Sequence, residues 1–450
     1  MQSTPPSSAL EGRATVTHPG GNVYMKLDLY IPYDDHRYIG GPSTFLRNLG
    51  AYLESQNVRL SASPDEARNI FVPIKFNLRK LCHIHDMGGR IIQRLDGIWY
   101  PEKHGDGHHH RNQTVGEIYR YLADLVIFQS EYSRKQCLEI FGPLPPESYR
   151  IIVNGVDKNI FFPLESRTEK ASGNPIRLIT TGNFRDRAMI EPIVLALDCL
   201  RDRFSFVLDV VGPCPNKALE TYFKREYVCY HGPKSLPAVA EFLREADIFL
   251  YSHLNPPCPN SVVEAVSSGL PVVGFDSGAM AELLPFGRDL LAPVSDAVFQ
   301  AYADFDPALL AAKIAHAFEN LPDLRHRAMA YSHLYSFEAC GDAYLQAFRE
   351  VLHQSRGRSE DSRLQRLLNT RVWRAGKTLA GRCSLDATAR SMYAAEMSRW
   401  DVDKLHDYLT RICRARAESL PPSEAVRFLD ACGSSLDQLK SCHKERGNMS

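Results

Sequence analysis

Several features that mark large classes of protein are missing from this sequence. No window reaches the roughly 18 consecutive apolar residues of a membrane-spanning helix. The start, MQSTPPSSALEGR, lacks the basic segment and apolar stretch of a secretory signal. The 53 basic residues are balanced by 53 acidic ones, which argues against binding to a polyanion through bulk charge. These absences favour a soluble, cytoplasmic protein.

Cysteine pairs with the spacing of metal or redox motifs are missing as well. The 11 cysteines are scattered from Cys82 to Cys442 without a Cys-x-x-Cys pair. In a chain without a secretory signal, an odd number of cysteines is typical of reduced thiols that pack in the core. The sequence does have 450 residues of globular composition, 44% of them hydrophobic, which is enough for more than one core.

Short apolar runs alternate with stretches of helical periodicity along most of the chain. The runs are 23–31, 69–74, 90–95, 125–130 and 150–155, and then 176–182, 206–212, 246–252 and 271–276. Buried-strand runs separated by helices are typical of parallel sheets with helices on both faces. We therefore predict two doubly wound α/β halves facing a cleft, in which ligands bind at the carboxyl ends of the strands.

The expected domain bounds follow from this pattern and from polar linkers. They are a flexible N-terminus (1–22), a first α/β domain (23–164), a second α/β domain with a helix that returns to the first (165–352), and a helical appendage (353–450). Residues 351–450 hold 18 Lys+Arg against 12 Asp+Glu, which leaves a net charge of −6 on residues 1–350. The basic, partly apolar stretch 356–382 is open to two interpretations, a helix on an anionic membrane surface or a helix docked on the acidic domains.

The most informative stretch is NPPCPNSVVEAVSSGLPVVGFDSGAMAELL (255–284). A proline-rich loop gives way to a helix, with its N-cap expected at Asn260 or Ser261. A helix N-terminus presents free N–H groups and a partial positive charge, which suit a diphosphate. Glu264 lies one turn into the helix, where it either reaches ribose hydroxyls or merely offsets the helix dipole. The spacing alone leaves both roles open.

This stretch resembles the nucleotide-binding signature of the retaining glycosyltransferases of the GT-B fold, the large group 1 family. The matching positions are Glu264, Gly269, Pro271, Val272, Asp276, Gly278 and Glu282. The segments 128–137, 151–163 and 246–253 are also similar to segments of that family, so the resemblance covers about residues 23–350. It implies an acceptor-side first domain and a second domain that binds a nucleotide-sugar.

The resemblance implies a donor site formed by several loops. Glu264 would hold the ribose, and the backbone at Asn260, Ser261 and Val262 would hold the diphosphate. The loop 180–192, with Gly182, Arg185 and Arg187, stands where the family neutralises the donor diphosphate, although Arg185, Asp186 and Arg187 could also satisfy one another. Gly212 would lie near the base and ribose or be a plain turn, and Gly40 and Gly41 would lie over the donor phosphates.

A second candidate group follows the apolar run at 90–95. Leu95-Asp96 stands where the family often has a His-Asp pair that contacts the sugar, and Arg94 and Asp96 either bind sugar or acceptor groups or form a structural ion pair. The histidine-rich segment 104–114 is expected to be a flexible acceptor-side loop. Its consecutive histidines point in different directions, so we expect no metal site there.

The predicted function is transfer of a sugar from a UDP- or GDP-linked donor to a saccharide or lipid-linked saccharide. The resemblance implies retention of configuration without a metal or other cofactor. Two positions depart from the family, because Pro256 stands where its first acidic residue is usual and Leu95 stands where the histidine of its His-Asp pair is usual. A catalytically silent nucleotide-sugar binder and a GT-B nucleotide-sugar epimerase therefore stay open as alternatives.

Overall fold

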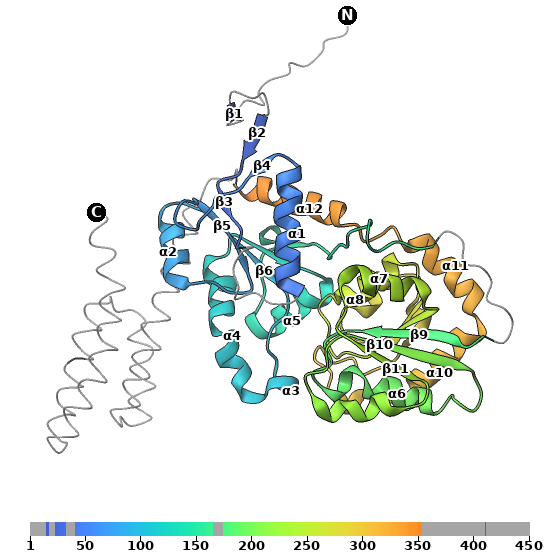
Figure 1. Ribbon diagram of the computed structural model, residues 1–450. Coiled ribbons are helices and arrows are strands. Elements are labelled where there is room, and N and C mark those ends of the chain that lie inside the picture. The colour runs from blue at the N-terminus through green and yellow to red at the C-terminus, as the bar shows by residue number, and fades with distance from the viewer. Residues whose placement is uncertain (1–14, 18–22, 33–40, 165–173, 353–409, 411–450) are drawn as a thin grey trace, which may run out of the picture. The chain divides into compact units, whose positions relative to one another are not determined.

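This computed structural model describes residues 15–17, 23–32, 41–164, 174–352 and 410 (Figure 1). The chain divides into two compact units, residues 1–354 and 355–450. The described part of the first unit holds two parallel sheets with helices packed on them, which confirms the predicted fold class. Apart from Thr410, the predicted appendage with its basic stretch 356–382 lies outside the described residues, as does Gly40.

The N-terminal domain is built on a five-stranded parallel sheet. Its strands, in spatial order, are β3 (Leu29–Tyr30), β5 (Asn69–Pro73), β6 (Ile91–Leu95), β7 (Leu125–Phe128) and β8 (Tyr149–Ile151). Its helices are α1 (Gly41–Ser55), α2 (Leu78–Asp86), α3 (Pro101–His104), α4 (His108–Glu117) and α5 (Glu131–Phe141). Because every residue of β6 is buried, its polar Gln93 and Arg94 must find partners inside the protein.

The predicted strand 23–31 is wrong as one element. The chain forms β2 (Val23–Lys26) and then β3, and these strands belong to different sheets. Strand β2 pairs with β1 (Thr15–Thr17), which lies within the segment expected to be flexible, and with β4 (Val58–Arg59). A continuous run of strand-forming residues does not reveal where a chain leaves one sheet for another.

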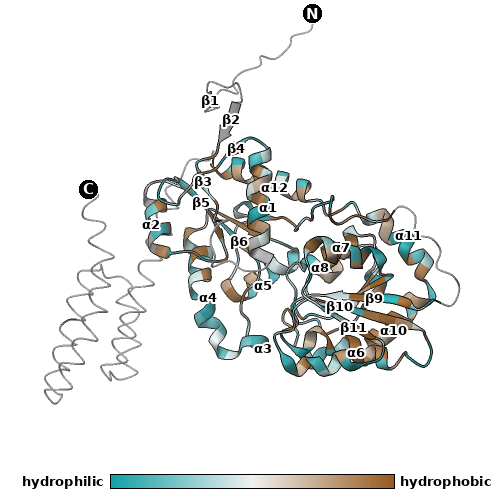
Figure 2. Cartoon of the chain, in the orientation of Figure 1, coloured by the Kyte–Doolittle hydropathy of each residue, from teal (hydrophilic) through white to brown (hydrophobic). Residues whose placement is uncertain are grey.

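The histidine-rich segment is helical rather than a flexible loop. Helices α3 and α4 cover most of 101–117, and α4 is largely teal in Figure 2, in keeping with its polar sequence. The helix is held because Val115 is fully buried and Asn112 bonds to the backbone of Trp99 through both its amide atoms. Tertiary contacts thus decided a segment whose composition suggested a loop.

The C-terminal domain has a six-stranded parallel sheet. In spatial order its strands are β11 (Val228–Gly232), β10 (Phe206–Val211), β9 (Ile176–Thr181), β12 (Ile248–Tyr251), β13 (Val272–Phe275) and β14 (Leu291–Ala292). Its helices are α6 (Glu191–Asp198), α7 (Leu236–Glu245), α8 (Asn260–Ser267), α9 (Met280–Leu283), α10 (Pro307–Glu319) and α11 (Leu321–Tyr331). This is the doubly wound order, which reverses between β9 and β12. The edge strands β11 and β14 were not predicted, since VCYHG is half exposed and β14 has only two residues.

The last described helix, α12 (Phe337–Leu352), packs on the N-terminal domain. Tyr344 and Phe348 join Phe45 and Phe71 in one apolar cluster. Figure 1 shows α12 in orange beside α1. The end of this chain segment is therefore part of the first domain's core, and it helps to hold the two domains together.

Candidate active site

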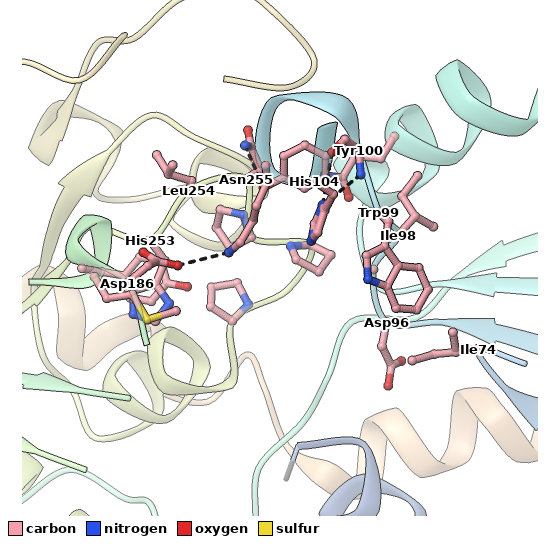
Figure 3. A pocket seen from close by; sticks show the side chains of 18 residues that line it. Ile74, Asp96, Ile98, Trp99, Tyr100, His104, Asp186, His253, Leu254 and Asn255 are labelled. Atoms are coloured by element: carbon pink, nitrogen blue, oxygen red, sulfur yellow. Dashed lines mark hydrogen bonds and ion pairs between the residues drawn. The ribbon is translucent and has the colours of Figure 1, made fainter. Parts of the chain in front are cut away.

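A cavity of about 370 Å³ lies between the two domains, next to the carboxyl ends of β6 and β12 (Figure 3). The N-terminal domain lines it with Ile74, Asp96, Gly97, Ile98, Trp99, Tyr100, Lys103, His104 and Gln136. The C-terminal domain lines it with Asp186, Met189, Tyr251, His253, Leu254, Asn255, Pro256, Pro257 and Pro259. Strand β12 borders the reversal of strand order, where doubly wound sheets bind ligands. Of the predicted site residues that the structure describes, Asp96 alone lines this cavity.

Arg94 is buried behind the cavity and is 1% exposed. Its guanidinium forms an ion pair with Asp96, donates to the Tyr344 hydroxyl and the Asn154 side chain at 2.9 Å each, and lies 3.7 Å from the centre of the Phe45 ring. Every one of these contacts is internal. Arg94 therefore positions Asp96, and the ion-pair interpretation suits it better than sugar binding does.

Asp96 brings a carboxylate from this buried cluster to the cavity. Its Oδ1 atom accepts from Arg94 and, at 2.7 Å, from Gln129. Burial raises the pKa of the Asp96 carboxyl, and the Arg94 charge opposes that rise. A chain of amides continues from Gln129 through Asn154 to Asn260, with two contacts of 2.8 Å. The carboxylate is thus tied to the first residue of α8 in the other domain.

His253 lies two residues beyond the end of β12, on the cavity wall opposite Asp96. Its ring stacks on Tyr251, with 4.6 Å between ring centres, and burial lowers its pKa to about 4. The Nε2 atom is buried and has no hydrogen-bond partner among the described residues. His253 therefore presents a neutral imidazole with one unused polar atom. The sequence reasoning missed it, although the rule of inspecting strand ends would have found it.

The domains are joined around the cavity by side chains from both sides. The Asn255 side chain donates to Tyr100 at 3.2 Å and accepts from Tyr132 at 3.1 Å. Lys103 pairs with Asp186 at 3.3 Å at the half-exposed rim. Asn255 itself has a positive φ of 49°, which asparagine tolerates better than most residues. These contacts give the cavity a defined shape.

The loop predicted to neutralise a diphosphate has its charged residues dispersed. Arg187 lies 3.6 Å from Glu191 and stacks over Tyr302, while the exposed Arg185 lies 2.9 Å from the Asn183 side-chain amide. The residue between them, Asp186, is the one that lines the cavity. Among the described residues Asp186 pairs with Lys103 and with neither arginine, so the alternative in which these three loop residues satisfy one another is not observed.

Helix α8 begins at Asn260, with Pro259 rather than Asn260 or Ser261 at the N-cap. Val262 is fully buried and its amide donates to Pro259, so it belongs to the core. Glu264 is half-buried, and burial raises its pKa to about 7. The side chain therefore carries a carboxyl group that a hydrogen-bonding ligand would help to ionise.

The predicted glycines have backbone roles. Gly212 has a φ of +136°, and a Cβ there would lie 1.9 Å from the carbonyl oxygen of Gly182. The Gly182 amide donates to the Val211 carbonyl at 3.1 Å, which continues the pairing of β9 with β10 past the end of β9. Gly41 is the first residue of α1. Glycine is required at position 212 by this close approach alone, whether or not a ligand binds.

Glu282 of α9 caps a helix of the other domain. Its two carboxylate oxygens accept from the backbone amides of Glu131 and Tyr132, at 2.7 and 2.6 Å, at the start of α5. The negative charge also suits the positive end of that helix. The α5 N-terminus is thus already occupied by a protein carboxylate.

Replacing Glu282 with alanine is expected to loosen this contact, since two amides lose a charged acceptor worth about 1.5–3 kcal/mol. Hydrogen exchange at the Glu131 and Tyr132 amides should rise. The exposed Glu139 on the same helix is a matched control, because Glu139→Ala should leave both amides protected. Equal exchange in the two variants would contradict the interdomain cap.

Within the described ranges, no three His, Cys, Asp or Glu side chains are grouped so that they could hold a metal ion. The rings of His108 and His109 lie 3.7 Å apart, but His108 Nδ1 is 2.8 Å from the Gly105 carbonyl.

Among the residues that the structure describes, none of the helices is long and apolar enough to cross a bilayer.

Comparison with known proteins relates part of the chain to one family. The model of the group 1 glycosyl transferases matches residues 175–320, and no curated protein sequence matches the chain. Sucrose-phosphate synthase from Thermosynechococcus elongatus is similar in structure at 15% identity, with a TM-score of 0.51 over 69% of this chain and 94% of that one. HepE from Anabaena, solved with UDP and glucose, is similar at 16% identity, with a TM-score of 0.50 over 69% and 96%. Residues 175–320 therefore match a group 1 glycosyl transferase domain, and the chain has the GT-B fold.

Proposed function

We propose that the protein transfers a sugar from a nucleotide-linked donor to a saccharide or lipid-linked saccharide, with retention of configuration and without a metal ion. The observation that carries this proposal is the cavity between the domains, which lies at strand ends of both sheets. Its lining combines apolar side chains with one carboxylate from each domain, two amides, a lysine and two histidines. A few polar groups in an apolar pocket are what orients a small polar ligand.

The nucleotide is proposed to bind along the start of α8. The first N–H groups of a helix have no partner within it, and the partial positive charge at that end stabilises a diphosphate. We assign the diphosphate to the backbone at Asn260 and Ser261, and the ribose hydroxyls to Glu264. The exposed Arg185 has room to turn toward the phosphates, whereas Arg187 is held by Glu191 and Tyr302.

In the proposed chemistry, a phosphate oxygen of the donor, rather than a protein side chain, takes the proton of the acceptor hydroxyl. As the bond from the anomeric carbon to the phosphate oxygen breaks, that oxygen takes the proton of the acceptor hydroxyl, which attacks the same face of the sugar. The helix amides and Arg185 lower the barrier by stabilising the growing charge on the departing diphosphate. Retention follows because attack and departure share one face.

The first test is calorimetric titration of the intact chain with UDP, GDP and ADP. HepE was solved with UDP and glucose, so UDP is the first nucleotide to try. We expect micromolar binding of one nucleotide, and then a product with the donor's anomeric configuration by NMR, with and without EDTA. No binding of any nucleotide would contradict the proposal, and an inverted product would contradict retention. Sugars interconverted without release of nucleoside diphosphate would favour an epimerase.

One observation favours a second candidate, a nucleotide-sugar binder without turnover. Pro256 is buried and packs against Gly278, where a Cβ would lie 2.4 Å from the proline ring. Its carbonyl accepts from Ala279 at 2.9 Å. The proline thus fills the place where the family usually has its first acidic residue. Nucleotide-sugar binding without release of nucleoside diphosphate, across a range of acceptors, would identify this function.

A further inference from the structure

Among the Trp and Tyr side chains that line the cavity, Trp99 is the one with a ring free to contact a ligand. Tyr100 and Tyr251, which also line the cavity, are 6% and 4% exposed. The Tyr100 ring stacks on Phe299 with 4.7 Å between centres, and Tyr251 stacks on His253. Trp99 is half-buried, and Figure 3 shows its indole standing at the N-terminal side of the hollow, across from His253 and Asp186.

The position of Trp99 is fixed from both ends. Its backbone exchanges two hydrogen bonds with the Asn112 side chain, and the next residue, Tyr100, donates its backbone N–H to the His104 ring at 3.2 Å. Lys75 lies 6.0 Å from the centre of the indole ring. A ring held in this way loses little conformational entropy when a ligand stacks on it.

A hydrogen-bond acceptor, the Asp96 carboxylate, lines the same side of the cavity as the indole. Both hydrogen bonds to Asp96 from the described residues end on Oδ1, one from Arg94 and one from Gln129. Oδ2 is left to accept from a ligand. Figure 3 shows the Asp96 carboxylate and the Trp99 indole on the same side of the hollow, and both residues line the cavity together with Ile74.

An aromatic face and a carboxylate on one wall of a cavity match the two kinds of surface of a pyranose ring. The axial C–H groups form an apolar face that packs on an aromatic ring, and the hydroxyls donate to a carboxylate. We propose that Trp99 and Asp96 form the subsite for the acceptor sugar. The sugar stacks on the indole and donates a hydroxyl to Asp96 Oδ2. This inference rests on the proposed transfer reaction, because only that reaction needs an acceptor.

The inference assigns a specificity role that the sequence analysis did not consider. Trp99 lies on the N-terminal domain, opposite the wall formed by the nucleotide-side residues Asp186 and His253. A sugar on Trp99 would thus approach the donor from across the cavity. Acceptors whose rings carry polar groups on both faces should bind poorly, since stacking would bury an unpaired hydroxyl.

Tryptophan fluorescence tests the subsite without any need for turnover. The sequence has three tryptophans, so Trp373→Phe combined with Trp400→Phe leaves Trp99 as the sole emitter in the full chain. We would titrate this variant, without nucleotide, with the methyl α- and β-pyranosides of glucose, galactose and mannose. A saturable change in emission is expected with at least one of them. A response to none would overturn the proposal, and a response to UDP-glucose alone would assign Trp99 to the donor and overturn the acceptor role.

Kinetic measurements on two substitutions then distinguish stacking on a flat ring from simple apolar contact. Trp99→Leu keeps an apolar side chain but loses the flat face, so the acceptor KM should rise about tenfold. The donor KM should rise less than the acceptor KM, and Trp99→Phe should restore most of the loss. An unchanged acceptor KM in Trp99→Leu, or an equal rise for donor and acceptor, would contradict the subsite. If no nucleotide binds in the calorimetric titration, the proposed function fails, while the fluorescence result still decides whether a sugar binds.

Discussion

Replacing Arg94 with alanine is expected to lower the free energy of unfolding by about 3–5 kcal/mol. The side chain is fully buried and joins four parts of the fold, since it contacts Asp96 after β6, Asn154, Phe45 of α1 and Tyr344 of α12. Its removal leaves a buried carboxylate without its counter-charge. Denaturation in urea, followed by circular dichroism, measures the loss.

Arg150 offers a matched control for this substitution. It also joins the N-terminal sheet to α12, through a 3.0 Å ion pair with Glu350, but its side chain is 42% exposed. Exposed pairs contribute little, so Arg150→Ala should cost less than about 1 kcal/mol. Similar losses in the two variants would show that burial of the Arg94 cluster adds nothing to stability.

Replacing Glu264 with glutamine is expected to remove a pH-dependent contribution to the free energy of unfolding. Burial raises the Glu264 pKa from its ordinary 4.5 to about 7, so the folded state holds a proton that the unfolded state has released between these values. Above pH 7 the carboxylate is charged and half-buried, and it lowers the free energy of unfolding. This loss of stability disappears as the pH falls toward 4.5, because the folded state takes up a proton there. At pH 8, Glu264→Gln should be more stable than the native chain by about 1–2 kcal/mol, with the exposed part of the side chain allowed for.

The same substitution should weaken nucleotide binding by roughly ten- to a hundredfold, the effect of losing a hydrogen bond to a charged group. Ribose hydroxyls favour the ionised carboxylate, so the affinity of the native chain should rise between pH 6 and 8, and that of Glu264→Gln should not. Calorimetry at both values provides the measurement. Glu241→Gln on the exposed face of α7 is the control. A variant that gains stability but keeps its affinity would leave Glu264 as a structural residue only.

The alternation of apolar runs and helices was sufficient to predict both sheets and most of their buried strands. Runs such as NIFVP and VVGF are apolar because strands of a parallel sheet are covered on both faces. Edge strand β11 was missed because one half-exposed strand needs no apolar run. The histidine-rich segment was missed because contacts such as that of Asn112 with Trp99 are not visible in local sequence.

The candidate site was also predicted only in part. Strand ends can be located from the sequence, and Asp96 was found by that rule. Which charged side chains reach the cavity depends on neighbours far along the chain. Arg94 turns inward because Tyr344, 250 residues later, accepts its Nε–H. Arg187 is held by Tyr302, whose place beside it depends on the folded sheet.

The sequence by itself determined the two parallel α/β domains, the order of their buried strands along the chain and the helix that follows the proline-rich loop, because these follow from local periodicity and turn residues. Only the tertiary structure decided that Asp96, Trp99 and His253 face one cavity while Arg94 and Val262 do not. The local sequence pattern indicates only where a residue lies along its own helix or strand. A site forms where elements from two domains meet, and that meeting depends on packing between residues that are distant in the chain.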